Sequence, residues 1–243
     1  MKIFLAGSGW NRHCWENRDF FDFYRLESFV YIKGEEKNIS KYKMFLLDSG
    51  AFTFMSKVNG VVDWDNYIET YADFINKYDV KYFFELDIDV IVGIKEVERL
   101  RNKLESLTNK KCIPVWHKSR GLDYWKKMCK EYDYIAIGGI VTQEIKRTEY
   151  DVFYPLLKIA KENNTKVHGL GFTNLKGLEK YKFYSVDSTS WLSGNRFGAV
   201  YWFDGNTMQK KNKENGQRVK THMTAINNFN EWVKFSEHAE KFL

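Results

Sequence analysis

The stretch FYSVDSTSWLSGNRFG, residues 183–198, decides the expected fold. It opens with a short apolar run that is typical of a buried strand. Asp187 follows directly, before hydroxyl side chains and a Gly/Asn/Arg loop. A carboxylate at the exit of a buried strand, followed by polar loop residues, is typical of the catalytic mouth of a parallel α/β barrel. Two other apolar runs lead into Asp48 and Asp87 in the same way, so the sequence predicts a shared rim.

Apolar runs alternate with loops and amphipathic helices along the chain. Eight of these runs are expected to form strands: 2–6, 44–47, 82–86, 112–115, 134–137, 166–170, 183–186 and 199–203. Repeated strand, loop and helix predict an α/β fold, a single (β/α)8 TIM-like barrel over residues 1–243 that closes with a helix over 221–242. Residues 10–40 show no clear period and are expected to form a loop with a short helix. An open doubly wound sheet is the alternative, disfavoured because the chain lacks a dinucleotide fingerprint and has polar groups after nearly every strand.

Composition narrows the class of protein and its partners. The 243 residues carry a net charge of +6, which permits a polyanionic partner without requiring one. Three scattered cysteines are too few for a disulfide framework or a four-ligand zinc site, which favours a reducing cytoplasm. No apolar run approaches the roughly 18 residues of a membrane-spanning helix, so we expect a cytoplasmic protein without a membrane partner. The oligomeric state stays open, with a homodimer as one alternative.

Paired carboxylates at facing strand ends suit glycosyl transfer. One carboxylate attacks the anomeric carbon and forms a covalent intermediate, while the other moves protons. The candidates are the acidic residues at the three strand ends: Asp48, Glu85, Asp87, Asp89 and Asp187. Each of them has a plainer alternative role as a helix cap or as part of a strand-end turn.

Two histidines and a glycine pair are further candidates. His117 follows a strand and is balanced between a catalytic and a structural role, whereas His168 lies inside a strand, where a hydrogen-bonded core residue is commoner. Gly138 and Gly139 follow the strand 134–137, and their lack of side chains lets a ligand approach the backbone. A tight turn explains the pair almost as well.

Strand-end motifs follow one another in a recognisable order. They are LLDSGAF (46–52), FELDID (84–89), PVWH (114–117), IAIGGI (135–140), VHGLGF (167–172) and YSVDSTSW (184–191). Together they resemble the motifs of the tRNA-guanine transglycosylase superfamily. The resemblance is closest to its shortened phage branch, the DNA 7-deazaguanine transglycosylases of the DpdA type, and covers about residues 44–198. A phage protein of this kind acts in the cytoplasm of the host cell.

The resemblance implies a role for the first motifs and for the last. Asp187 matches the aspartate that attacks C1′ of the nucleotide and expels guanine. Asp48 matches the aspartate that handles the proton of the exchanging base. Phe52 falls where the family has an aromatic side chain that stacks on the base, and Asp87 matches the carboxylate that reads the donor edge of the purine.

Other motifs complete the implied substrate site. Gly138 and Gly139 match glycines whose backbone groups contact the base carbonyl, and His117 lies at the same rim. His168 aligns with an apolar residue that covers the other face of the base, so it departs from the family while keeping the ability to stack. The loop that helps to position the nucleotide corresponds to Asn195 and Arg196.

Two departures from the tRNA enzymes bear on the substrate. Their zinc site of three cysteines and one histidine follows the nucleophile, but this chain has no cysteine beyond Cys129, and Ala51 replaces the second glycine of their DSGG motif. The resemblance therefore implies a glycosyltransferase without metal or redox cofactor that exchanges guanine in DNA for a free 7-deazaguanine base such as preQ0. The target guanine must be flipped out or single-stranded to reach a barrel rim. Exchange in tRNA, nucleoside hydrolysis and a non-catalytic nucleic-acid-binding barrel stay open as alternatives.

Overall fold

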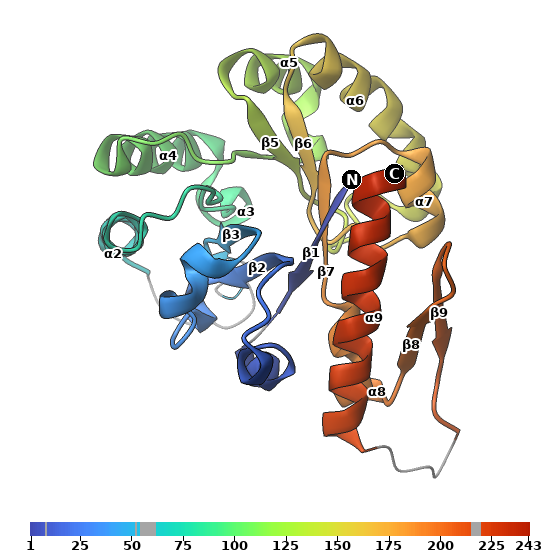
Figure 1. The fold of residues 1–243 in the computed structure, drawn as a ribbon. Coiled ribbons are helices and arrows are strands. Elements are labelled where there is room, and N and C mark those ends of the chain that lie inside the picture. Colours follow the sequence, from blue (N-terminus) through green and yellow to red (C-terminus); the bar gives the residue numbers. More distant parts are fainter. Residues whose placement is uncertain (8, 52, 54–61, 215–219) are drawn as a thin grey trace.

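A curled sheet of seven strands forms the centre of the protein (Figure 1). The computed structural model describes the chain except residues 8, 52, 54–61 and 215–219, and except the side chains at 9, 10, 195 and 196. Within this part all neighbouring strands of the sheet run parallel, in the order β3-β2-β1-β7-β6-β5-β4. The strands are β1 (Lys2–Ala6), β2 (Tyr24–Ser28), β3 (Met44–Asp48), β4 (Val115–Trp116), β5 (Tyr134–Ile137), β6 (Lys166–Gly169) and β7 (Ser185–Ser188).

The regular ladder stops at β3 and β4, so the predicted closed barrel of eight strands is wrong in this respect. The segment 82–86 lies between these two edges and contributes only isolated bridges, Leu47 to Phe83 and Phe84 to Ile113. A continuous ladder would need the Val115 N–H to bond the backbone of this segment. The Glu85 carboxylate accepts that N–H instead, at 2.7 Å. The side chain thereby replaces the backbone partner and ends the pairing.

The predicted eighth strand lies outside this sheet. It forms β8 (Val200–Phe203), which pairs antiparallel with β9 (Met208–Lys211). Asn228 of the C-terminal helix fixes this hairpin, because its side chain accepts the Tyr201 N–H at 2.9 Å and donates to the Ala199 carbonyl at 2.9 Å. The apolar run 199–203 therefore packs on a helix instead of completing the sheet.

The expected loop over 10–40 contains β2, a central strand between β1 and β3. Its side chains alternate between the two faces: Tyr24 and Leu26 join the interior cluster, while Arg25 and Glu27 lie in the outer layer with almost no exposure. Buried charges at alternate positions hide this strand from a search for apolar runs. Short 3₁₀ helices flank it: η1 (Gly9–Cys14), η2 (Glu16–Arg18), η3 (Phe29–Tyr31) and η4 (Glu36–Lys41).

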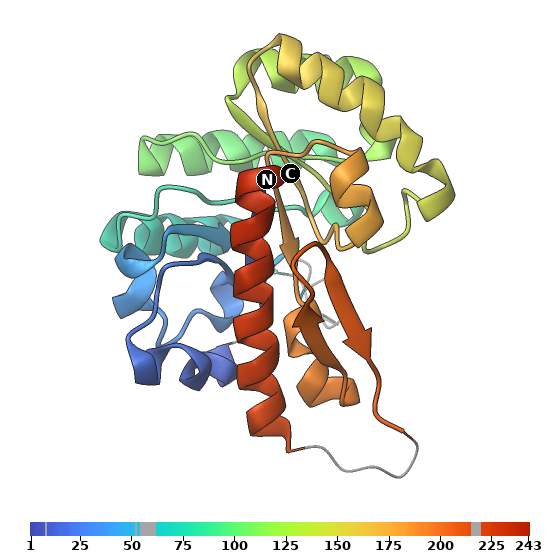
Figure 2. The ribbon, with the colours of Figure 1, turned by 45° about the vertical axis from the view of Figure 1, so that its right-hand side comes forward.

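Helices cover the outer face of the sheet. They are α2 (Trp64–Lys77), α3 (Asp89–Val92), α4 (Ile94–Thr108), α5 (Gly121–Glu131), α6 (Phe153–Glu162), α7 (Leu175–Lys180), α8 (Ser193–Phe197) and α9 (Thr221–Phe242), with the 3₁₀ helices η5 (Lys118–Arg120), η6 (Arg147–Val152) and η7 (Ser190–Leu192). Asp63 caps α2 by accepting the Asn66 N–H, and Asn174 caps α7 by accepting the Gly177 N–H. Figure 2 shows α9, the predicted C-terminal helix, running along the molecule beside the β8–β9 hairpin. No helix in the described part of the chain is long and apolar enough to cross a membrane.

Two apolar layers enclose the sheet. Aromatic residues make up 17% of the chain, and most of those that are buried lie in the larger layer, between strands and helices. The smaller layer fills the concave interior and consists of Phe4, Ala6, Tyr24, Leu26, Leu46, Phe84, Ile113, Val115, Tyr134 and Ala136. Because these side chains occupy the middle of the interior, a ligand site belongs at the carboxyl ends of the strands.

Candidate active site

Three aspartates meet at the carboxyl ends of the strands. Asp48 ends β3, Asp187 lies in β7, and Asp87 follows the segment 82–86. Burial raises the pKa of Asp48 to about 6, and the negative charges of Asp187 and Asp87 contribute in the same direction, while the Gly50 N–H opposes them. The charges of Asp187 and Asp87 thus act on Asp48 at the carboxyl ends of the strands, where the sequence predicts a shared rim.

Asp187 is held by donors from the neighbouring strand β6 and the turn after it. Its Oδ1 accepts the Gly171 N–H at 2.6 Å and lies 3.2 Å from His168 Nε2. Gly171 has a φ of 68°, and a Cβ there would lie 2.3 Å from a Val141 methyl group, so glycine is needed to present this N–H. Such donors stabilise the ionised carboxylate. The sequence predicts backbone amides or hydroxyls in this role, and the Ser188 hydroxyl instead accepts the Ser190 N–H.

His168 does not take the predicted stacking role. Its side chain is fully buried and its ring packs against Phe4 and Phe84, with centroid distances of 5.9 and 5.4 Å. Its Nδ1 lies 2.7 Å from the Ser185 hydroxyl. No face of the ring is accessible to a base, and the plainer interpretation of a hydrogen-bonded core histidine is correct.

His117 joins Asp87 to a residue that the sequence does not single out, Glu144. Its Nε2 lies 2.7 Å from Asp87 Oδ1 and its Nδ1 lies 2.8 Å from Glu144 Oε2. Burial opposes the charge on the ring, yet the two carboxylates prevail and raise the pKa of His117 to about 9. The imidazolium therefore holds both carboxylates at neutral pH.

The glycine pair has a structural explanation in this contact. A Cβ at Gly138 would lie 2.8 Å from His117 Nε2, and a Cβ at Gly139, which has a φ of 76°, would lie 2.6 Å from Glu144 Oε2. Glycine is therefore required at both positions for the histidine and the glutamate to approach the strand end. The predicted contact with a base carbonyl stays a prediction.

The charged His117 predicts a pH-dependent stability. Because its pKa rises from 6.5 to about 9 on folding, the stabilisation is fully present below pH 6.5 and is lost as the pH rises through 9. We expect the difference in unfolding free energy between wild type and His117→Gln to shrink by about 3 kcal/mol between pH 6.5 and 9.5 in urea titrations. The exposed His222→Gln serves as the control for replacing a histidine by glutamine. A difference between wild type and His117→Gln that stays constant over this pH range would contradict the charged ring.

Glu85 and Asp89 have structural partners. Glu85 is fully buried on the outer side and receives hydrogen bonds from Arg101 at 2.5 Å and Arg120 at 3.2 Å. Arg120 also donates to Asp89 at 3.0 Å. These contacts remove both acids from the list of candidate nucleophiles.

Asp87, Asp89 and His117 have donor atoms within 4.8 Å of one another, a spacing that suits a metal ion. The charge balance of the group argues against one. Arg120 lies 3.8 Å from Asp87 as well as bonding Asp89, and both nitrogens of His117 contact carboxylates. A divalent cation would have to displace the guanidinium and the proton of the ring, so we assign no metal here.

Three predicted residues cannot be placed in the site. Phe52 lies outside the described residues, and the side chains of Asn195 and Arg196 are not described, although their backbone belongs to α8.

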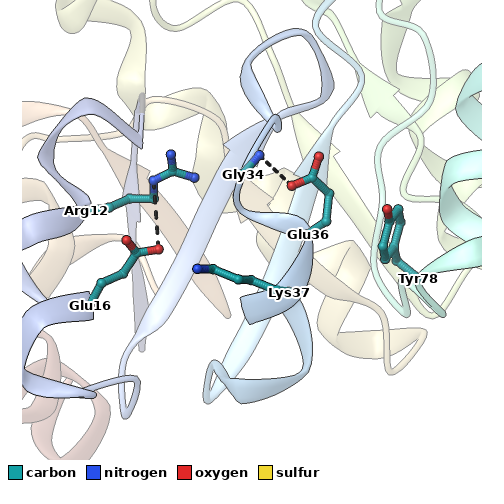
Figure 3. A pocket seen from close by; sticks show the side chains of 6 residues that line it. All are labelled: Arg12, Glu16, Gly34, Glu36, Lys37 and Tyr78. Carbon is teal, nitrogen blue, oxygen red and sulfur yellow. Dashed lines mark hydrogen bonds and ion pairs between the residues drawn. The ribbon is translucent and has the colours of Figure 1, made fainter.

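A separate cavity of about 570 Å³ lies over η1, η4 and the end of α2 (Figure 3). It contains none of the three aspartates and is lined by Arg12, Glu16, Gly34, Glu36, Lys37 and Tyr78.

The fold and the site together define an α/β protein with a curled parallel sheet and an acidic mouth. No family model and no curated protein matches the chain. Among solved structures, the chain is similar to a "putative fructose-1,6-biphosphate aldolase from Coccidioides immitis", a TIM-barrel-like protein, with a TM-score of 0.56 and 10% identity. The alignment covers 99% of this chain and 92% of the other. At this identity the similarity concerns the fold alone.

Proposed function

We propose that the protein is an enzyme, a base-exchanging glycosyltransferase that replaces guanine in DNA with a free 7-deazaguanine base. The observation that carries the proposal is the coupling of Asp48 to Asp187 and Asp87 at one mouth. Two carboxylates with different environments are what a double displacement at a sugar carbon requires. The ordered strand-end motifs that resemble the transglycosylases support the same assignment.

The fold is consistent with a modified (β/α)8 barrel. We propose that the segment 82–86 occupies the place of a regular strand between β3 and β4, because its two bridges reach both edges. The carboxyl ends of all parallel segments then face one mouth, as in other barrels.

The proposed reaction has two displacements. In the first, a carboxylate oxygen of Asp187 bonds to C1′ while the bond from C1′ to guanine breaks, and the leaving base takes a proton from protonated Asp48. In the second, the incoming base gives a proton to Asp48 and bonds to C1′, while the bond from C1′ to Asp187 breaks. Both aspartates return to their starting states, so the proposed scheme balances without a redox cofactor.

Asp48 has the ionisation that the proton transfer needs. Because its pKa is about 6, both its acid and its base form are accessible near neutral pH. We expect Asp48→Asn to slow exchange by at least about 100-fold. The same variant should raise the unfolding free energy at pH 7 by about 3 kcal/mol, because the ionised carboxylate is disfavoured in the folded state. This gain should fade as the pH falls through 6 toward 3, where the wild-type carboxyl is protonated in both states.

Urea unfolding and an exchange assay measure the two effects on the same samples. Asp123→Asn is the matched control, since the Asp123 side chain is 97% exposed, and it should change neither quantity. Loss of stability together with activity would contradict the role given to Asp48.

The proposed function is tested by incubating the wild-type protein with labelled preQ0 or labelled guanine and a guanine-containing nucleic acid. Single-stranded DNA, duplex DNA, tRNA and free guanosine are compared in parallel. We expect label to enter DNA, and to enter single-stranded DNA faster because no base must be flipped. Labelling of tRNA alone would favour the tRNA enzyme, and release of guanine without incorporation would favour a hydrolase. A folded protein that does neither would refute the proposal.

A further inference from the structure

A line of hydrogen-bonded side chains runs from Asp187 into the interior. Tyr134 Oη lies 2.5 Å from Ser185 Oγ, Ser185 Oγ lies 2.7 Å from His168 Nδ1, and His168 Nε2 lies 3.2 Å from Asp187 Oδ1. Ser185 and His168 are fully buried, and Tyr134 is nearly so. Buried polar groups that are hydrogen-bonded to one another in this way form a rigid arrangement in an apolar interior.

The direction of the hydrogen bonds in this line follows from the residues at its two ends. An ionised carboxylate only accepts, so His168 Nε2 carries a proton and donates to Asp187. In the neutral ring Nδ1 then accepts from the Ser185 hydroxyl, whose oxygen accepts from Tyr134. Burial raises the pKa of Tyr134, which keeps its proton in place as the first donor. All donors therefore point toward the mouth.

The residue types are those of a serine hydrolase triad, but the order in space is reversed. In a triad the serine faces the substrate and the aspartate is buried. Here Ser185 has no exposed surface, and Asp187 is the member that lies at the mouth. The serine cannot reach a substrate, so this line of hydrogen-bonded side chains acts on the aspartate.

Both donors to Asp187 converge on the same oxygen. The Gly171 N–H and His168 Nε2 both contact Oδ1. Within the described part of the chain, no hydrogen bond to Oδ2 is found. We infer that His168 is a positioning residue that, with Gly171, holds Oδ1 and presents Oδ2 as the attacking atom. This inference rests on the proposed function. The rings of Phe4 and Phe84 fix the imidazole, so the orientation of the carboxylate is set before substrate arrives.

Two substitutions at position 168 separate positioning from packing. Leucine fills the space without a donor, whereas glutamine supplies an amide N–H toward Asp187. We expect His168→Leu to slow formation of the covalent intermediate by about 10- to 100-fold with little change in KM, because one hydrogen bond to a charged group is lost. His168→Gln should recover most of the rate. Thermal unfolding shows whether the variants are equally folded.

A purely structural role predicts another pattern. Equal losses in two equally folded variants, or full activity of His168→Leu, would overturn the inference. The nitrogen resonances of histidine side chains give a readout that needs no activity. The chain has five histidines, so the signal lost in His168→Gln identifies this ring.

The inference requires a proton on Nε2 of His168 in the wild-type protein. A ring protonated only at Nδ1 would overturn it, because Nε2 could then not donate to Asp187. If the wild type shows no exchange on any substrate while the Nε2–H form is found, the proposed function fails and the orientation of Asp187 by His168 is still supported.

Discussion

Asp187→Asn should abolish base exchange, with a loss on the order of 10³-fold or more, and should form no covalent adduct with DNA. The amide oxygen is a poor nucleophile, so the first displacement cannot take place. The fold should survive, because an amide oxygen still accepts from Gly171 and His168 and has the same size. Intact-protein mass measurement after incubation with guanine-containing DNA detects the adduct in the wild type and its absence in the variant.

Asp89→Asn is a demanding control for this experiment. Asp89 is an aspartate of the same rim, but its partner is Arg120 and it has no proposed part in the reaction. Its adduct should form at a rate close to wild type. An adduct that persists in Asp187→Asn would assign the nucleophile elsewhere. Nucleic-acid binding that is unchanged in Asp187→Asn, with neither adduct nor exchange in the wild type, would favour a non-catalytic binding protein.

The sequence predicts those strands whose apolar side chains are consecutive. The runs at 2–6, 44–47 and 134–137 became strands close to the predicted bounds, because both faces of a parallel sheet are covered and demand apolar residues. β2 was missed because two of its five positions carry charges. Glu35, which contacts Arg25, lies in a turn, and no local pattern in the sequence predicts this contact.

The candidate site, like the fold, could be predicted from the sequence only in part. The rim of Asp48, Asp87 and Asp187 follows from strand polarity alone, since the carboxyl ends of parallel strands lie together. The contacts of Glu144 with His117 and of Gly171 with Asp187 depend on loops whose path is set by tertiary packing. Sequence spacing could therefore locate the acidic residues of the site, but it could not predict which residues contact them.

Replacement of Arg25, whose positive charge is buried on the outer side of β2, should strongly lower the unfolding free energy. Arg25 has no exposed side-chain surface and contacts the carboxylates of Glu27 and Glu35, while its guanidinium also donates to the carbonyls of Leu5 and Gly7 at 2.9 and 2.7 Å. Arg25→Met would leave two carboxylates in the apolar layer without a counter-charge. We expect the unfolding free energy at pH 8 to fall by about 3 to 5 kcal/mol.

The loss should depend on pH in a defined direction. Burial raises the pKa of Glu27 to about 7 even with Arg25 beside it, so without the arginine Glu27 becomes protonated more readily. Lowering the pH from 8 to 5 should therefore restore part of the lost stability, since a neutral carboxyl is easier to bury than a carboxylate. Denaturant unfolding followed by tryptophan fluorescence at the two pH values measures this recovery.

Two further variants show whether the buried charge is responsible. Arg99→Met is the matched control, because Arg99 also contacts two carboxylates but its side chain is 47% exposed, and a surface ion pair contributes about 1 kcal/mol or less. Combining Arg25→Met with Glu27→Gln and Glu35→Gln should recover much of the loss, since amides keep the hydrogen bonds to Ser28 and Tyr42 without charge. If Arg25→Met were as stable as Arg99→Met, the ion cluster would not hold β2 in the sheet.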